Sequence, residues 1–196
     1  MTRKLDDPRD AVLTATLPLV AEQGWTVTTA RQGCIQGGMD PDLVLALFPA
    51  GLDDLLIHFS DYLDRLMLKK LAKIDIDQLR VRDRISLAVM ARLEAAAPYK
   101  DALRLALAYW SVPPRSLRAP RIVWRTADRI WDFAGDTATD YNHYTKRGLL
   151  AGVLTTTTLV WLKDHSQDLE VTELFLANRI ENVMKLGQII GKLKRK

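Results

Sequence analysis

Residues 127–147 read ADRIWDFAGDTATDYNHYTKR, which predicts the end of one helix, a tight turn and the start of a second helix. Apolar side chains on one helical face lead up to the turn at spacings of 3, 4 and 3: Trp124, Ala127, Trp131 and Ala134. Gly135 follows as a helix-ending glycine, because glycine adopts the left-handed conformation that closes a helix without strain. The chain is therefore expected to be helical on both sides of this turn.

Turn and helix-capping residues follow the glycine: Asp136, Thr137, Thr139 and Asp140. Two aromatic rings, an amide, an imidazole and two cations come next: Tyr141, Asn142, His143, Tyr144, Lys146 and Arg147. Loops that join rigid helices often carry function, which makes this segment a candidate binding surface. The alternative is that the rings pack on a neighbouring helix and the cations are merely solvated, and residue types alone leave both open.

The same segment resembles the signature of the ubiquinone-biosynthesis accessory proteins, TetR-like lipid-binding proteins that assist the di-iron demethoxyubiquinone hydroxylase. The matching positions run in register without a gap: Ala127, Asp128, Trp131, Ala134, Gly135, Asp136, Thr139, Asp140, Tyr141, Asn142, Tyr144, Thr145, Lys146 and Arg147. His143 departs from the pattern, since this position is often Trp in the family. The resemblance covers most of the chain, most closely residues 124–147, and implies an all-α, TetR-like fold.

Composition sets wider bounds on the class of protein. The 196 residues are 48% hydrophobic, enough for a sizeable core, and the net charge of +4 permits weak attraction to anionic lipid or nucleic acid. Cys34 is the one cysteine, which fits a reducing compartment. The sequence offers no secretory signal and no run of 18 apolar residues. We expect a protein of the bacterial cytoplasm, peripheral to the inner membrane, or alternatively one on the matrix side of the mitochondrial inner membrane.

Residues 1–50 are predicted to form a small head of three short helices, in a helix-turn-helix pattern that resembles the TetR type. Its first helix begins at Asp7-Pro8 and ends at Gly24. The segment in the place of a DNA-recognition helix, residues 40–49, reads DPDLVLALFP. It has two carboxylates and none of the side chains that donate to phosphates or base edges, so the head is interpreted as degenerate and DNA binding is not expected.

Residues 51–196 are predicted to form a helical body for lipid binding and dimerisation. Two stretches are apolar or Thr on nearly every side. Residues 101–110 are either plain core or the wall of an apolar cavity, and residues 148–162 are expected to form a central helix. Helical phase selects seven candidates for such a lipid-binding wall: Leu105, Trp131, Leu150, Leu154, Thr158, Ile180 and Met184. The hydroxyls of residues 155–158 are expected to bond back to the preceding helical turn.

Two basic features accompany the body. Five arginines recur at spacings of 3, 3, 4 and 4 ahead of the signature: Arg115, Arg118, Arg121, Arg125 and Arg129. This row either receives anionic groups or is a solvated face that Asp128 and Asp132 partly neutralise. The C-terminal segment GQIIGKLKRK has the composition of a membrane anchor, carried by Ile189, Ile190, Lys192, Leu193 and Lys194, with a frayed basic tail as the alternative.

No catalytic constellation is recognisable in the sequence. His58, His143 and His165 lie far apart, and no Glu-x-x-His pair exists that would hold a di-iron site. A glycine-rich phosphate loop is also missing. We therefore expect a protein that is not an enzyme and that carries no metal or cofactor.

The family resemblance supplies an expected function. It implies a non-catalytic homodimer that binds an isoprenoid lipid or quinone precursor and presents it to the membrane-associated di-iron hydroxylase or another enzyme of the pathway. It also implies a partner-binding patch: Asp140, Tyr141, Asn142, His143, Tyr144 and Arg147. His143 in place of Trp puts the affinity of this contact in doubt, because an imidazole buries less area than an indole. The alternatives are a TetR-family transcriptional regulator that responds to a hydrophobic ligand and a dimeric structural protein without one.

Overall fold

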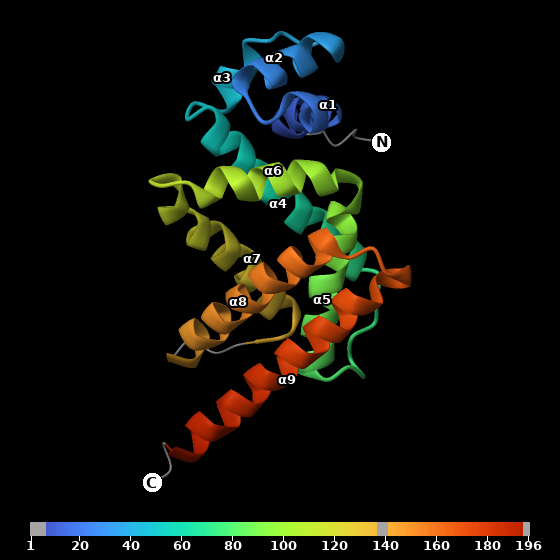
Figure 1. Ribbon diagram of the computed structural model, residues 1–196, viewed down its shortest axis with the longest axis vertical. Helices are drawn as coiled ribbons and strands as arrows, with labels where there is room; N and C mark the ends of the chain where they lie inside the picture. The colour runs from blue at the N-terminus through green and yellow to red at the C-terminus, as the bar shows by residue number, and fades with distance from the viewer. Residues whose placement is uncertain (1–6, 137–140, 194–196) are drawn as a thin grey trace. The chain divides into compact units, whose positions relative to one another are not determined.

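The computed structural model describes residues 7–136 and 141–193 (Figure 1). These residues form helices and connecting turns without a strand, so the all-α prediction is confirmed for the part of the chain described. The chain divides into two compact units, one made of Met1–Arg65 and Ala96–Ala119 and the other of Leu66–Ala95 and Pro120–Lys196. The predicted head, residues 1–50, lies within the first unit, and the predicted boundary between head and body stays a prediction.

The first unit contains α1 (Pro8–Gln23), α2 (Val27–Gln36), α3 (Leu43–Leu47), α6 (Lys100–Ser111) and the start of α4 (Leu52–Leu71). The helix start predicted at Asp7-Pro8 is confirmed, because the Asp7 carboxylate accepts a hydrogen bond from the Arg9 backbone N–H. Helices α1 and α2 cross closely at Gly33, where an added Cβ would lie 2.7 Å from the Ala15 carbonyl oxygen. Only glycine allows this approach, which fixes the helix-turn-helix geometry.

A buried polar network joins α1 to α4. Both oxygens of Asp10 accept hydrogen bonds from Arg65, at 2.6 and 2.7 Å, and His58 Nε2 lies 2.8 Å from Asp10 Oδ1. The hydrogen bonds from Arg65 lower the pKa of Asp10, against the effect of burial. Burial lowers the pKa of His58, partly opposed by its hydrogen bond to Asp10. His58 is 7% exposed, because Asp10 gives its ring a hydrogen-bond partner inside the fold.

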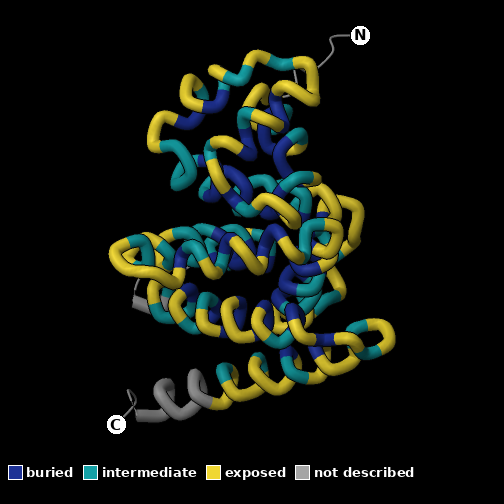
Figure 2. The backbone as a smooth tube through the Cα atoms, turned by 45° about the horizontal axis from the view of Figure 1, so that its top comes forward, coloured by how far each residue is buried: buried dark blue, intermediate teal, exposed yellow. Residues whose placement is uncertain are grey.

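The second unit contains α5 (Val81–Ala96), α7 (Ala119–Phe133), α8 (Tyr141–Lys163), α9 (Glu170–Leu193) and the end of α4. Short 3₁₀ turns complete the chain: Ala97–Tyr99, Arg115–Leu117 and Gln167–Leu169. Figure 2 shows that buried residues follow one side of most helices and exposed residues the other. No helix among the described residues is long and apolar enough to cross a bilayer.

Helix α8 is less enclosed than its sequence suggests. Leu150, Leu154 and Trp161 are buried, but Leu159 is half exposed, at 51%. The apolar residues around α8 had predicted a central helix, and that expectation is wrong for the single chain because a row of exposed residues, Gly148, Thr155 and Leu159 among them, follows the helix. The prediction for the threonine hydroxyls is confirmed for Thr155, Thr156 and Thr158, each of which donates to the carbonyl oxygen four residues earlier. It is wrong for Thr157, whose buried hydroxyl has no hydrogen-bond partner among the described residues.

The corner between α8 and α9 is held by one carboxylate. Asp164 accepts hydrogen bonds from the backbone N–H groups of Ser166 and Thr172, both at 2.8 Å, and from their hydroxyls. These bonds keep the pKa of Asp164 well below its usual range, first through the Ser166 hydroxyl and then through Thr172. The corner therefore sets the direction in which α9 leaves α8.

Candidate functional site

The turn after α7 is a Schellman motif that closes the helix as the sequence predicts. The Gly135 N–H donates to the Asp132 carbonyl oxygen at 3.1 Å, and the Asp136 N–H donates to the Trp131 carbonyl oxygen at 3.0 Å. Gly135 has a φ of 85°, in the left-handed region that favours glycine. The motif turns the Asp136 side chain back toward the protein, where it is 6% exposed.

One arginine of α8 gathers three carboxylates around this turn. The Arg147 guanidinium bonds to Asp128 through Nε, to Asp136 at 3.1 Å and to Asp132 at 3.4 Å. Asp128, Asp132 and Asp136 are spaced by four residues, so they follow one side of α7 and its turn. Burial works to lower the pKa of Arg147, but its hydrogen bonds to Asp128 and Asp136 outweigh this and raise it. We call Arg147 and these three aspartates the Arg147 cluster.

Lys146 makes further contacts to the same turn. Its ammonium lies 2.6 Å from Asp136 Oδ1 and 5.3 Å from the centre of the Trp131 ring. Asp136 thus receives a cation on each oxygen, which compensates a carboxylate that is almost completely buried. The start of α8 is tied to the end of α7 by charge as well as by the chain.

Tyr144 is the exposed feature of this arrangement. Its side chain is 64% exposed, and its ring lies 5.2 Å from the His143 ring and 6.2 Å from the Trp124 ring, centre to centre. The tyrosine was expected in a partner-binding patch, and the structure places it where a partner can reach it. Arg147, expected in the same patch, is 2% exposed and lies beneath the surface. Asp140 and the side chains of Tyr141 and Asn142 lie outside the described residues, so their role stays a prediction.

Replacing Gly135 by Ala is expected to destabilise the fold by about 1–2 kcal/mol, because an L side chain is strained in the left-handed conformation. An added Cβ would meet the Arg84 guanidinium at 3.4 Å, a contact that a flexible side chain relieves, so the backbone carries most of the cost. Urea unfolding measures the change. Gly152→Ala is the matched control, because an added Cβ there meets nothing within 4 Å, and an equal loss in both variants would contradict the argument.

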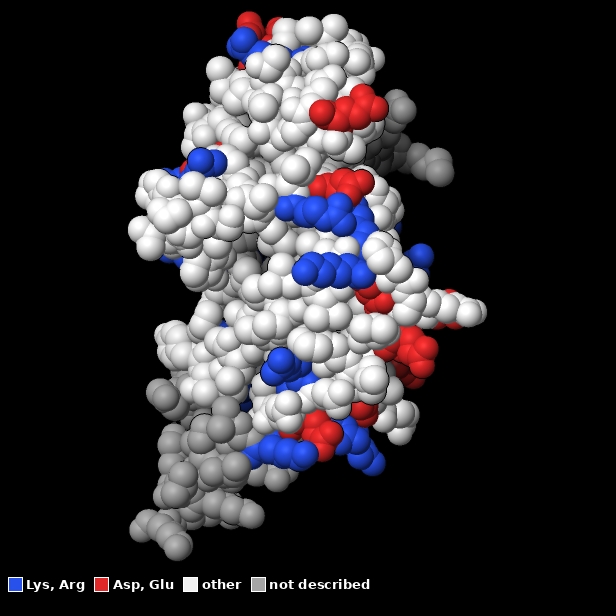
Figure 3. Space-filling model, in the orientation of Figure 1, with Lys and Arg blue, Asp and Glu red and all other residues white. Residues whose placement is uncertain are grey.

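Two arginines of the row have local partners in the first unit. Arg118 pairs with Asp53, and Arg115 lies over the Tyr109 ring at 4.2 Å. The residues expected to neutralise the row, Asp128 and Asp132, bond to Arg147. On the face shown in Figure 3, blue and red side chains adjoin at several places. Arg115 and Arg118 therefore have partners within the fold, a result that spacing along the chain could not reveal.

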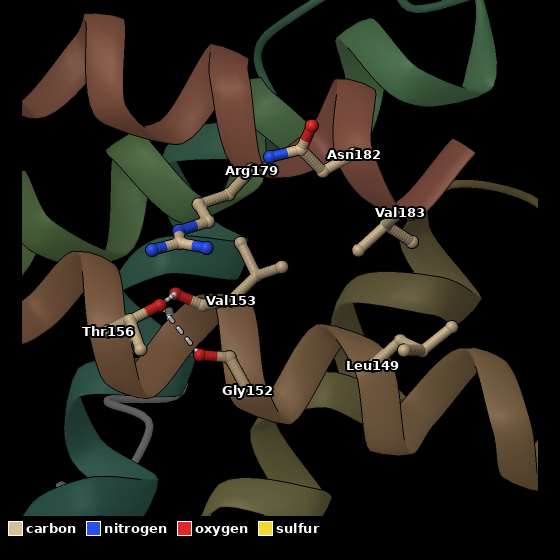
Figure 4. A pocket seen from close by; sticks show the side chains of 7 residues that line it. All are labelled: Leu149, Gly152, Val153, Thr156, Arg179, Asn182 and Val183. Atoms are coloured by element: carbon tan, nitrogen blue, oxygen red, sulfur yellow. Dashed lines mark hydrogen bonds between the residues drawn. The ribbon is translucent and has the colours of Figure 1, made fainter. Parts of the chain in front are cut away.

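A groove of about 330 Å³ lies between α8 and α9 (Figure 4). It is lined by Leu149, Gly152, Val153, Thr156, Arg179, Asn182 and Val183. The Thr156 hydroxyl turns toward the carbonyl oxygens of its own helix, as the dashed lines in Figure 4 indicate. Three aliphatic side chains and a glycine thus face the space together with one guanidinium and one amide, a lining that suits an amphiphilic ligand.

None of the residues predicted to form the lipid-binding wall lines this groove, although Leu150, Leu154, Ile180 and Met184 adjoin lining residues in sequence. Trp131, Leu150, Leu154 and Thr158 are buried, and Ile180 is half-buried. Leu105, in the first unit, is 36% exposed, and Met184 is 48% exposed. The Trp131 indole N–H is buried and has no hydrogen-bond acceptor among the described residues. A lipid-binding role for these seven residues stays a prediction.

The head and the C-terminal segment complete the sites named from the sequence. Arg31, at the edge of the recognition position, donates to Asp42 at 2.9 Å, which further reduces the positive charge available there. Helix α9 continues to Leu193, so Ile189, Ile190, Lys192 and Leu193 belong to a helix. Their side chains and all of Lys194 lie outside the described residues, and membrane anchoring by them stays a prediction.

The fold defines a class of protein: an all-α, TetR-like chain with a short helix-turn-helix segment and long C-terminal helices. It is similar to the solved structure of the TetR transcriptional regulator from Nitrosomonas europaea ATCC 19718, with a TM-score of 0.72. The match covers 91% of this chain and 99% of the other at 21% sequence identity, so it establishes the fold alone.

Residues 117–187, which hold the Arg147 cluster and the groove, match the COQ9 family model. The chain is similar to the mitochondrial ubiquinone biosynthesis protein COQ9 of Rattus norvegicus and of Homo sapiens, with 30% identity over 190 residues in each comparison. It is 31% identical to the Drosophila melanogaster protein over 192 residues. These matches cover 93–96% of this chain but only 59–61% of the relatives' length. The family resemblance expected from the signature is confirmed.

Proposed function

We propose that this protein is a non-catalytic accessory protein of ubiquinone biosynthesis that binds an isoprenoid quinone precursor and presents it to the di-iron demethoxyubiquinone hydroxylase. The observation that carries the proposal is the signature segment, which folds into an ion-paired turn with Tyr144 exposed beside it. A rigid surface around an exposed aromatic anchor is suited to a protein partner. The similarity to COQ9 proteins over nearly the whole chain supports the pathway.

The α8–α9 groove supports the lipid-binding part of the proposal. Its volume of about 330 Å³ is at the lower end of the range for small-molecule sites, so it holds a head group or a short part of an isoprenoid chain. Elsewhere in the same unit, on α7, the Trp131 indole N–H is buried without an acceptor among the described residues. A buried donor of this kind is costly, and a quinone carbonyl oxygen would satisfy it.

The partner surface in this proposal has two layers. Tyr144 and His143 make the outer layer, which contacts the hydroxylase together with Asp140, Tyr141 and Asn142. Arg147 is buried, so we assign it to positioning: it fixes the start of α8 against α7 and thereby the direction of Tyr144. The accessory protein is proposed to act as a homodimer on the membrane surface, either in a bacterial cytoplasm or in the mitochondrial matrix. The second location is suggested by its relatives, which are named as mitochondrial proteins.

A TetR-family regulator is the second candidate, favoured by the fold of the Nitrosomonas protein. Helix α3 argues against it, because Leu43–Leu47 offers five aliphatic residues and is preceded by Asp40 and Asp42. Carboxylates on a helix that would face the major groove of DNA repel the DNA phosphates. Salt-dependent binding to DNA, measured by fluorescence anisotropy, would favour the transcriptional regulator over the accessory protein.

The lipid-binding part is tested by native mass spectrometry followed by organic extraction. The wild-type chain is expected to carry, or to take up when offered, an isoprenoid quinone or its precursor. Gly152→Phe should reduce the bound fraction, because an added side chain at Gly152 extends into open space in the groove. Thr155→Phe is the matched control, one residue from the lining and exposed on α8. Equal uptake by both variants would show that the lipid does not bind in the groove. A wild-type chain that takes up no lipid would contradict the lipid-binding part of the proposal.

A further inference from the structure

The connection between α6 and α7 carries an exposed apolar cluster that the proposed function does not use. Leu117 is 78% exposed, the highest value among the large hydrophobic side chains of the described residues, and Val112 is 47% exposed. Pro113 and Pro114 between them are also exposed. All four belong to the first compact unit. We call residues 112–118 the proline loop.

Backbone hydrogen bonds hold the proline loop in one shape. The Ser116 N–H donates to the Val112 carbonyl oxygen at 3.2 Å, the Leu117 N–H to Pro114 at 3.2 Å and the Arg118 N–H to Arg115 at 2.9 Å. Each of these bonds closes a turn within the loop itself. The exposure of Leu117 is therefore a property of an ordered turn rather than of a loose segment.

Side chains on either side anchor this turn to the unit. The Arg115 guanidinium lies over the Tyr109 ring of α6, 4.2 Å from its centre. Arg118 pairs with Asp53 of α4, and the Tyr109 hydroxyl bonds to the same carboxylate. The Asp53 side chain is 17% exposed and the Arg118 side chain is 57% exposed, so the carboxylate lies deeper than the arginine that covers it.

Positive residues predominate in the part of the first unit that contains the loop. Residues 102–119 contain three arginines and no aspartate or glutamate, and the one carboxylate described at the loop, Asp53, pairs with Arg118. Exposed aliphatic side chains next to arginines, with no carboxylate in the same stretch, complement a surface that is hydrocarbon inside and anionic outside. A protein partner would more often be met by an aromatic anchor, and the loop has none.

We infer that the proline loop is a membrane-contact site, at which Val112 and Leu117 enter an anionic lipid surface, Arg115 remains among the phosphate groups and Arg118 stays paired with Asp53. This contact is separate from the C-terminal segment, and it does not depend on the groove or on the hydroxylase. It gives the first unit its own attachment to the bilayer.

The direct test places an environment-sensitive fluorophore on Leu117→Cys in the full chain. The native Cys34 is completely buried and should remain unlabelled. Vesicles of phosphatidylcholine mixed with phosphatidylglycerol are expected to shift the emission to the blue, and vesicles of phosphatidylcholine alone to leave it nearly unchanged. Ile35→Cys, 63% exposed on α2, is the matched control and should show no shift. Protein that floats with the anionic vesicles without a shift at position 117 overturns the inference.

Flotation of variants supplies a second measurement. Val112→Ser with Leu117→Ser is expected to lower the partition coefficient for anionic vesicles by about tenfold, from the loss of two inserted aliphatic groups. Arg115→Gln should lower it by roughly fivefold, the effect of one cation near an anionic surface. Ile35→Ser should leave it unchanged. Equal partitioning of the double variant and Ile35→Ser would show that the loop serves something other than a membrane.

Discussion

Replacing Arg147 by Met is expected to reduce the free energy of unfolding by about 2–4 kcal/mol. The substitution keeps most of the side-chain volume and removes the one cation that contacts all three carboxylates of the Arg147 cluster. Asp136 is only 6% exposed, so it would lose the Arg147 cation while its carboxylate remains buried. Asp128 and Asp132 are 43% and 66% exposed, and solvent screens their repulsion, which keeps the expected loss below that of a fully buried pair.

Urea unfolding monitored by circular dichroism measures this loss. Arg31→Met is the matched control, because Arg31 also pairs with an aspartate but at an exposed position of the head. Exposed pairs of this kind contribute about 0–1 kcal/mol, so the control should change little. Similar losses in the two variants would mean that the Arg147 cluster contributes no more than a surface ion pair.

Replacing Tyr144 by Ala is expected to weaken binding to the di-iron hydroxylase by about 10- to 30-fold, the usual effect of truncating an aromatic anchor at the centre of an interface. The ring is 64% exposed in the free chain, so its removal costs the fold little. Almost all of the effect should therefore fall on association with the partner. This prediction follows from the proposed function and tests its protein-binding part alone.

Surface plasmon resonance with the hydroxylase of the same organism measures the affinity. Tyr144→Phe keeps the ring and should retain most of the binding, whereas Ile35→Ala, which removes an exposed side chain elsewhere, should retain all of it. Unfolding curves of Tyr144→Ala should match those of the wild type. Full affinity in Tyr144→Ala would exclude this surface as the contact.

Local features were the most predictable from the sequence. The helix start at Asp7-Pro8 and the helix end at Gly135 each depend on the backbone preferences of one or two residues, and both are confirmed. The back-bonded hydroxyls of Thr155 and Thr156 are confirmed for the same reason, since each bonds to a carbonyl oxygen four residues earlier. These interactions span at most one helical turn.

The groove is lined by residues that sequence reasoning did not select. The predicted wall used Leu150, Leu154 and Thr158, whereas the groove is lined from α8 by Leu149, Gly152, Val153 and Thr156. Neighbouring residues on a helix point about 100° apart, so two sets that differ by one position face different directions. Because α8 is apolar or Thr on nearly every side, its sequence alone does not indicate which side packs against other helices.

The sequence by itself determined the all-α class, the positions of the signature turn and the family resemblance, because these depend on periodicity, on single glycine and proline positions and on a contiguous motif. Tertiary structure decided that Arg147 is buried, that Arg118 pairs with Asp53, and that the groove lies between α8 and α9. Each of these depends on which residues far apart in the chain meet, and charge or polarity alone does not specify the partner. Arg147 is therefore buried and structural while Arg115 is accessible to solvent, although both are arginines. Packing alone determines this difference.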